Sequence, residues 1–176
     1  MSHKQLPTLK AHKDMPNQPA GPGPVGYRFE HRIHIQARPQ EVWAILSDIS
    51  NWGNWATLYP RSSGQLTPGG QFQVTLKVPG TPGFTSTSSQ VTFEENRFLS
   101  YEPSTMFPSF MMSTLRYIQI EEQPDGTSIV CNGEVLYKPV GSLFARLMQN
   151  NLMKGLTAMN QGLKTQAEKL TSKKGR

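Results

Sequence analysis

The sequence predicts an α+β fold in which a curved antiparallel β-sheet wraps around one long C-terminal α-helix, with two short helices after the first strand. The helix is predicted because apolar residues recur at the 3.6-residue period from Ser142 to about Leu170. The sheet is predicted because much of the chain between Tyr27 and Tyr137 alternates between apolar and polar side chains. A helix about 40 Å long with one apolar face is unstable alone in water, so it needs a broad partner surface.

Charge is concentrated at the two ends of the 176-residue chain. Residues 1–38 carry a net charge of +4, residues 39–163 carry −2 and residues 164–176 carry +4, which gives the overall +6. A nucleic-acid-binding domain carries its basic patch on folded elements, so the slightly acidic middle argues against nucleic acid as a partner. The basic ends leave open a weak contact with an anionic membrane surface.

Several classes of chemistry are disfavoured by what the sequence lacks. The single cysteine, Cys131, allows no disulfide and no cysteine-based zinc site within one chain. The sequence has no GxxxxGK(S/T), no GxSxG and no HExxH, so we expect neither a metal nor a cofactor. No apolar run approaches the ~20 residues that span a bilayer, and the N-terminus lacks the apolar core of a secretory signal. We therefore expect a cytoplasmic protein without stable membrane insertion.

The composition predicts one folded domain over residues 27–171 with a tail at each end. Residues 1–26 are rich in proline, glycine, lysine and glutamine and show no periodicity, which predicts a disordered or loosely docked basic tail. Residues 172–176, with the sequence SKKGR, are predicted to form a basic C-terminal tail.

The first predicted strand covers Tyr27 to Gln36. Phe29, His31 and Ile33 share one face of this strand, and charged residues occupy most of the other. His31 therefore points inward with the apolar side chains. Two readings stay open: a core histidine hydrogen-bonded to a neighbour, or a polar group inside a ligand cavity.

Two short helices are predicted after this strand. Pro39 suits the first turn of one helix, and Glu41 favours its positive N-terminal end. Asp48 or Ser50 is predicted to cap the other, which runs through Trp52.

The same stretch carries a resemblance to a known family. The run IHIQARPQEVW from Ile33 to Trp43, followed by DISNWGNW from Asp48 to Trp55, resembles the opening of START-like domains, also called the Bet v 1-like or SRPBCC superfamily. The members similar to polyketide cyclases and dehydrases look closest. The resemblance covers about residues 27–170 and implies a helix-grip fold, in which these tryptophans pack and the two short helices cradle the C-terminal helix.

Further strands are predicted over Gln71–Val78, Phe84–Glu94 and Arg97–Glu102. The segment from Pro103 to Met112 differs, because it is strongly apolar in a loop-like context. It is interpreted as a loop folded over the core, a flexible lid at a cavity mouth or a membrane-touching tip.

A hairpin is predicted from Ser113–Glu122 and Thr127–Tyr137. The isoleucines favour an inward face that also carries Arg116, with Glu134 close in register on the neighbouring strand. An exposed ion pair contributes little to stability. A buried Arg116–Glu134 pair facing a ligand is costly unless it is well hydrogen-bonded, and so indicates function.

The leading functional hypothesis is a binding module for a hydrophobic small molecule, such as a lipid, an isoprenoid or a polyketide. The ligand is expected between the sheet and the C-terminal helix, where methionines suit irregular apolar shapes. The predicted ligand-binding residues are Phe29, His31, Tyr59, Phe72, Val74, Tyr101, Met112, Arg116, Glu134, Met148, Leu152, Leu156 and Met159.

The alternative that the resemblance implies is a cyclase- or dehydratase-type enzyme that uses the same cavity without a metal or nucleotide cofactor. His31 is then the candidate general base, and Tyr59, Tyr101 or Arg116 is the candidate group that stabilises an enolate oxygen. A third class, an assembly factor acting through its surface, also fits the fold.

Overall fold

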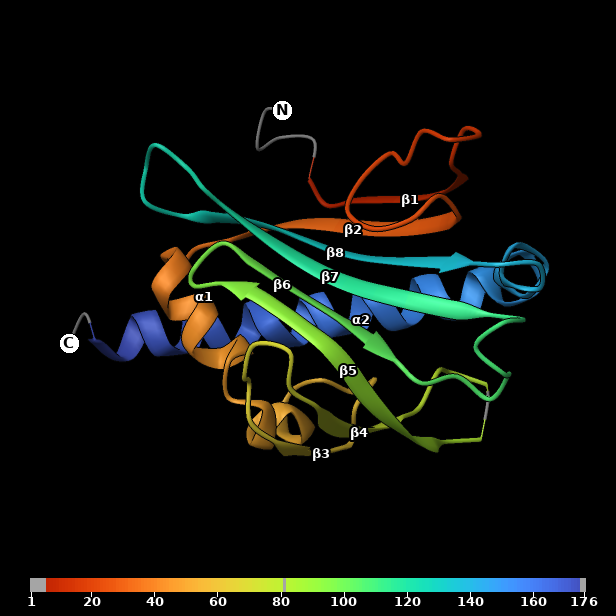
Figure 1. Cartoon of the computed structure of the whole chain (residues 1–176). Coiled ribbons are helices and arrows are strands. Elements are labelled where there is room, and N and C mark those ends of the chain that lie inside the picture. Colours follow the sequence, from red (N-terminus) through yellow and green to blue (C-terminus); the bar gives the residue numbers. More distant parts are fainter. Residues whose placement is uncertain (1–5, 81, 175–176) are drawn as a thin grey trace.

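The computed structural model describes residues 6–80 and 82–174, and these form one eight-stranded antiparallel sheet, two α-helices and a 3-10 helix (Figure 1). In chain order the elements are β1 (Thr8–Lys13), β2 (Tyr27–Ile35), α1 (Pro39–Leu46), η2 (Ile49–Asn54), β3 (Arg61–Gly64), β4 (Phe72–Leu76), β5 (Phe84–Glu94), β6 (Phe98–Pro103), β7 (Ser113–Glu122), β8 (Ser128–Tyr137) and α2 (Gly141–Lys174).

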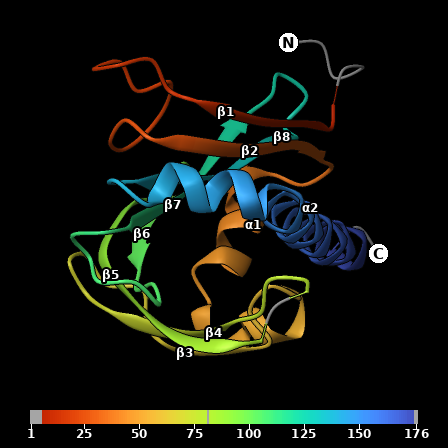
Figure 2. The same cartoon turned by 90° about the vertical axis from the view of Figure 1, so that its right-hand side faces the viewer.

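The strands follow the order β1-β2-β8-β7-β6-β5-β4-β3. Strands β3 to β8 therefore form a meander, and β8 lies between β7 and β2. Figure 2 shows the strongly curved sheet with α1 and α2 on its concave side. A bulge in β5 contributes to this curvature, because the register with β6 shifts between Ser89 and Thr92 and Gln90 has a φ of 52°. The predicted helix-grip arrangement, with two short helices after β2, is confirmed.

Helix α2 packs along the concave side of the sheet through a face of buried apolar residues. These residues are Leu152, Leu156, Met159, Leu163 and Ala167. The first turns of α2 run in a different direction from the rest of the helix (Figures 1 and 2). The helix also continues through Lys174, three residues beyond the predicted end of the domain at residue 171, while residues 175–176 lie outside the described part.

Close packing explains a glycine in the middle of α2. A Cβ atom added to Gly162 would lie 2.2 Å from the carbonyl oxygen of Trp55, which directly follows η2. The neighbouring Trp52 is fully buried, and its indole Nε1 donates a 3.0 Å hydrogen bond to the carbonyl oxygen of Leu46. The two short helices therefore cradle α2, as the resemblance implied.

The N-terminal segment is docked rather than disordered. Strand β1 pairs with β2 along its whole length, from Thr8 opposite Arg32 to Lys13 opposite Tyr27. The tail predicted over residues 1–26 is therefore wrong from Thr8 onward, and residues 1–5 lie outside the described part. Strand β1 escaped prediction because it is an edge strand held mainly by backbone hydrogen bonds, so its side chains show no apolar alternation.

A buried ion pair fixes this segment on the outer face of the sheet. The Asp14 carboxylate accepts a 2.9 Å hydrogen bond from Nη2 of Arg28, and both side chains are fully buried. The backbone amides of Gly26 and Ala20 also donate to Asp14. Burial alone raises the pKa of this carboxyl, but the bonds from Arg28 and the two amides outweigh it and lower the pKa.

Candidate functional site

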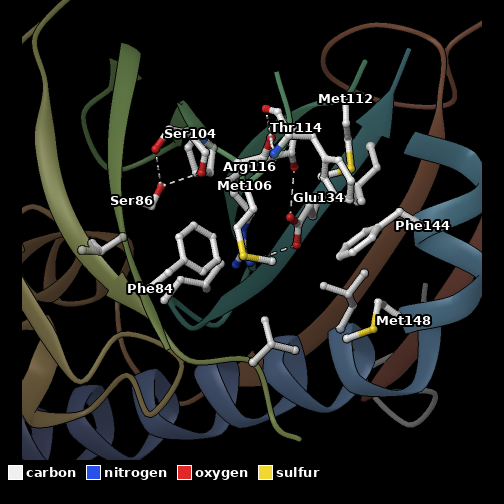
Figure 3. Close-up of a pocket in the computed structure, with 18 of the residues that line it drawn as sticks. Phe84, Ser86, Ser104, Met106, Met112, Thr114, Arg116, Glu134, Phe144 and Met148 are labelled. Carbon is white, nitrogen blue, oxygen red and sulfur yellow. Dashed lines mark hydrogen bonds and ion pairs between the residues drawn. The ribbon is translucent and has the colours of Figure 1, made fainter. Parts of the chain in front are cut away.

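A cavity of about 200 Å³ opens between the sheet and the first turns of α2 (Figure 3). Strands β4, β5, β7 and β8, the segment around residues 103–107 and α2 all contribute to its wall. Most of the lining is apolar, and it includes Val74, Leu76, Val78, Phe84, Met106, Phe107, Met112, Leu136, Phe144, Met148 and Leu152.

The cavity lies at one end because aromatic side chains fill the middle of the interior. Trp52 stacks on Tyr59 with ring centroids 5.5 Å apart and meets Phe72 and Tyr101 at 5.6 and 6.0 Å. Tyr59 is the member of this cluster that reaches the cavity wall. The space beyond it, under the first turns of α2, is left unfilled.

An ion pair forms the polar part of the wall. Arg116 on β7 lies directly opposite Glu134 on β8, and its Nη1 donates a 3.2 Å hydrogen bond to Glu134 Oε2. Thr114 Oγ1 donates to the other carboxylate oxygen at 3.0 Å, and Arg116 Nη2 donates to Asn132 Oδ1 at 2.9 Å. The prediction that this face of β7 points inward is therefore confirmed, since Arg116 is 2% exposed and lines the cavity.

One hydrogen-bond donor of the Arg116 guanidinium has no acceptor among the described residues. Nε of Arg116 is buried and has no hydrogen-bond partner among the described residues. A buried unpaired donor is costly unless a water or a ligand satisfies it, so this atom marks a point where an oxygen atom would be stabilised.

A pair of serines forms a second polar point of the wall, which the sequence analysis missed. Ser86 Oγ donates a 3.0 Å hydrogen bond to the carbonyl oxygen of Ser104, and Ser104 Oγ donates to Ser86 Oγ at 3.4 Å (Figure 3). Alternation along β5 could have indicated that Ser86 points inward, because Ser86 shares a strand face with Phe84. Because every residue from Thr85 to Ser89 is polar, this alternation was not apparent in the sequence.

Two tyrosine hydroxyls meet behind the cavity wall. Tyr59 Oη lies 3.1 Å from Tyr101 Oη, and the Arg116 guanidinium lies over the Tyr59 ring at 5.9 Å from its centroid. Burial raises the pKa of both tyrosines, most strongly that of Tyr101. Both hydroxyls therefore stay protonated at neutral pH and keep a proton to donate.

The structure divides the predicted ligand-binding residues into two groups. Those that line the cavity are Tyr59, Val74, Met112, Arg116, Glu134, Met148 and Leu152. Those that are buried elsewhere in the interior are Phe29, His31, Phe72, Tyr101, Leu156 and Met159. Alternation predicts which face of a strand points inward, but it does not predict how far along that face the cavity extends.

His31 lies among the second group, against the middle of α2. Its Nδ1 lies 2.9 Å from Asn160 Nδ2, which also donates to the His31 backbone carbonyl at 2.9 Å. An amide donor facing Nδ1 requires that atom to be unprotonated. Burial also lowers the pKa of His31. The structure therefore places His31 as a core histidine outside the cavity lining, and a role as catalytic base there has no geometric support.

We expect the stability of the protein to fall as the pH drops below 6.5. The ordinary pKa of histidine is 6.5, and the folded pKa of His31 lies below it, so the unfolded state takes up a proton first. A His31→Gln variant keeps an acceptor for Asn160 but has no imidazole to protonate. Its free energy of unfolding should therefore depend less on pH in this range. Urea unfolding at several pH values measures it, and equal slopes for the two proteins would contradict the assignment.

The segment from Pro103 to Met112 covers one side of the cavity. Met106, Phe107 and Met112 line it, and the Phe107 ring meets the Phe144 ring of α2 with centroids 5.7 Å apart. Met106 is 71% exposed, so it lies at the cavity mouth. This segment is therefore part of the cavity wall.

The described residues contain no group of three histidine, cysteine or acidic side chains placed to hold a metal ion. In the same part of the chain, no helix has the length and apolar character needed to cross a membrane. Cys131 is buried, and burial raises its pKa to about 12, so its thiol is not reactive at neutral pH.

An antiparallel sheet that grips a C-terminal helix beside an apolar cavity is the arrangement of START-like domains. A family model described as polyketide cyclase / dehydrase and lipid transport matches residues 27–168, and the chain belongs to this family. A search of the curated proteins found no match.

Solved structures with the same fold include enzymes and proteins described only by superfamily. The Zhui aromatase/cyclase from Streptomyces sp. R1128 is 12% identical, with a TM-score of 0.65 over 80% of this chain and 93% of that one. A START superfamily protein from Mycobacterium smegmatis is 12% identical, with a TM-score of 0.61 over 81% and 98%.

The di-domain aromatase/cyclase StfQ of the steffimycin biosynthetic pathway is 14% identical, with a TM-score of 0.65 over 82% of this chain. The match spans 51% of StfQ, so this chain corresponds to about half of that protein. At these identities the likeness shows the fold alone.

Proposed function

We propose that this protein binds a small hydrophobic molecule, of the lipid, isoprenoid or polyketide kind, in the cavity beside the first turns of α2. The observation that carries the proposal is an apolar cavity whose wall contains a hydrogen-bonded ion pair between buried Arg116 and partly buried Glu134. Membership of a family that includes cyclases and lipid transporters supports a ligand-binding role.

The size of the cavity limits the ligand. A volume of about 200 Å³ lies below the ~300–1,000 Å³ of most ligand pockets, so the bound part is small or the molecule extends through the mouth at Met106. The methionines of the wall adapt to irregular apolar shapes.

The polar groups of the wall orient the ligand. Arg116 Nε lacks a partner among the described residues, so a ligand oxygen that accepts from it would satisfy a buried donor. Glu134 is the one carboxylate among the described residues of the lining, and it can accept from a ligand hydroxyl. The proposed ligand therefore carries a hydroxyl or carbonyl group at its inner end.

Naphthol and naphthalene are suitable probes, because they share an apolar body and differ by one hydroxyl. We expect naphthol to bind more tightly than naphthalene by roughly tenfold, the value of one hydrogen bond. We expect Met148→Trp to weaken the binding of both probes at least ~tenfold, since the indole would occupy the cavity. Probe fluorescence titration measures both effects.

Met153→Trp is the matched control, because Met153 lies on the same helix, is partly buried and does not line this cavity. It should bind the probes like the unmodified protein. Equal affinities for the two variants would refute the cavity as the binding site. Native mass spectrometry of freshly purified protein would then identify any ligand that is retained.

An enzymatic role is the second candidate, and the tyrosine pair favours it. Protonated Tyr59 lines the cavity beside Arg116, with Tyr101 against its hydroxyl, and it is the candidate group that stabilises an oxyanion in an aldol or dehydration step. Glu134 is then the candidate base, since His31 lies outside the cavity. A ligand identified by mass spectrometry and incubated with the protein distinguishes the roles, because an enzyme changes its mass or absorbance and a carrier does not. The proposed location for either role is the cytoplasm.

A further inference from the structure

Four large apolar side chains are exposed together at the mouth of the cavity. Met106 and Phe110, in the segment between β6 and β7, are 71% and 73% exposed. Leu143 and Leu147, in the first two turns of α2, are 61% and 76% exposed. We call these four residues the mouth patch. Exposed apolar side chains that gather in one place mark an interaction surface.

The two segments of the mouth patch are held against each other. The Val140 amide donates a 3.0 Å hydrogen bond to the carbonyl oxygen of Met111, and Phe107 packs on Phe144. Both segments lie at the right-hand end of the molecule in Figure 1 and face the viewer in Figure 2. The fold therefore holds the two segments of the mouth patch side by side.

The first turns of α2 are apolar on both sides. Phe144 and Met148 point into the cavity, as Figure 3 shows, while Leu143 and Leu147 are exposed. A helix that is apolar all round is normally buried. The exposed side of this stretch therefore has the character of a surface that is covered when the protein works.

Positive charge surrounds the mouth patch. Between Glu134 and Glu168 the sequence contains no acidic residue, and the first two basic residues of this stretch are Lys138 and Arg146. Both side chains are exposed; Arg146 directly precedes Leu147, and Lys138 lies five residues before Leu143. The nearest carboxylates are engaged, because Glu134 pairs with Arg116 and Glu102 interacts with Tyr137.

We propose that the mouth patch docks on the surface of an anionic lipid bilayer. Apolar side chains beside lysine and arginine are the composition of segments that lie in a membrane interface. Because Met106 belongs to both the patch and the cavity wall, docking would bring the cavity mouth to the apolar phase. The proposal goes beyond ligand binding, and its test needs no cavity ligand.

Co-flotation of the full chain with vesicles tests the proposal. We expect binding to vesicles in which a third of the phosphatidylcholine is replaced by phosphatidylserine. Binding should weaken at high salt, which screens the cationic residues. The double variant Phe110→Ser, Leu147→Ser should bind these vesicles on the order of tenfold more weakly or worse, since two apolar side chains are lost from the interface. Arg146→Gln should lower the affinity about fivefold.

Leu170→Ser is the matched control, because Leu170 is exposed on the same helix, far from the mouth patch. It should bind vesicles as the unmodified protein does. Failure of the unmodified protein to bind anionic vesicles overturns the proposal, and so does unchanged binding by the double variant. A dimer that the double variant dissociates would overturn it as well, because the patch would then be covered by a second copy of the chain.

Discussion

Replacing Asp14 by alanine is expected to lower the free energy of unfolding by about 3–5 kcal/mol. The change leaves the guanidinium of Arg28 buried without its carboxylate, and it removes the acceptor of two backbone amides. Removing one partner of a buried pair costs far more than the pair itself contributes. Urea unfolding at neutral pH measures the loss.

The Glu121→Ala variant is the matched control for this result. Glu121 pairs with Arg32 at 2.8 Å on the same sheet, but its side chain is 48% exposed, so the loss should be about 0–1 kcal/mol. Similar losses for the two variants would mean that the N-terminal segment is not docked in solution. A double variant, Asp14→Ala with Arg28→Met, should recover part of the loss because no buried charge remains.

The Gly162→Ala variant is expected to cost about 1–3 kcal/mol, although alanine normally stabilises a helix relative to glycine. The added methyl group would lie 2.2 Å from the Trp55 carbonyl oxygen, and this oxygen belongs to the backbone and cannot rotate away. Either α2 or the chain after η2 must therefore move. Thermal unfolding measures the loss as a lower midpoint.

The comparison for this variant is Gly155→Ala on the same helix. Its added methyl group would lie 3.0 Å from Cδ1 of Leu58, the end of a flexible side chain, so we expect a change near zero. A Gly162→Ala protein as stable as the unmodified one would show that α2 does not approach η2 this closely.

The fold was predictable because a helix or strand that buries one face shows a regular spacing of apolar residues in the sequence. Strands β5 and β7 have the predicted bounds, since Phe84–Glu94 and Ser113–Glu122 end in turns with clear signals. Helix α2 was predicted from its apolar arc, but its C-terminal end was not, because the arc ends at Leu170 and residues 172–174 are polar. Strand β1 left no apolar pattern, and its docking depends on Asp14, one carboxylate in a polar stretch.

The candidate site was predictable only in part, for a different reason. Arg116 and Glu134 were found because a charged pair on an inward strand face is unusual. His31 carried the same signal, yet it packs on Asn160 of α2. Where a cavity ends depends on which large side chains fill the interior, here the cluster around Trp52. The extent of the cavity is therefore a property of three-dimensional packing, and the spacing of residues along the chain does not predict it.

The position of β1 has a consequence for how the chain behaves beside other copies of itself. The match to the family model begins at Tyr27, so β1 lies outside the matched residues. A protein cut at that boundary would present the whole length of β2 as an open strand edge, which is a template for sheet-to-sheet association. At the opposite margin the edge is only four residues long, in β3. Strand β1 covers that edge with a short six-residue strand that carries Lys10 and Lys13, which makes the new edge a poorer template for such association.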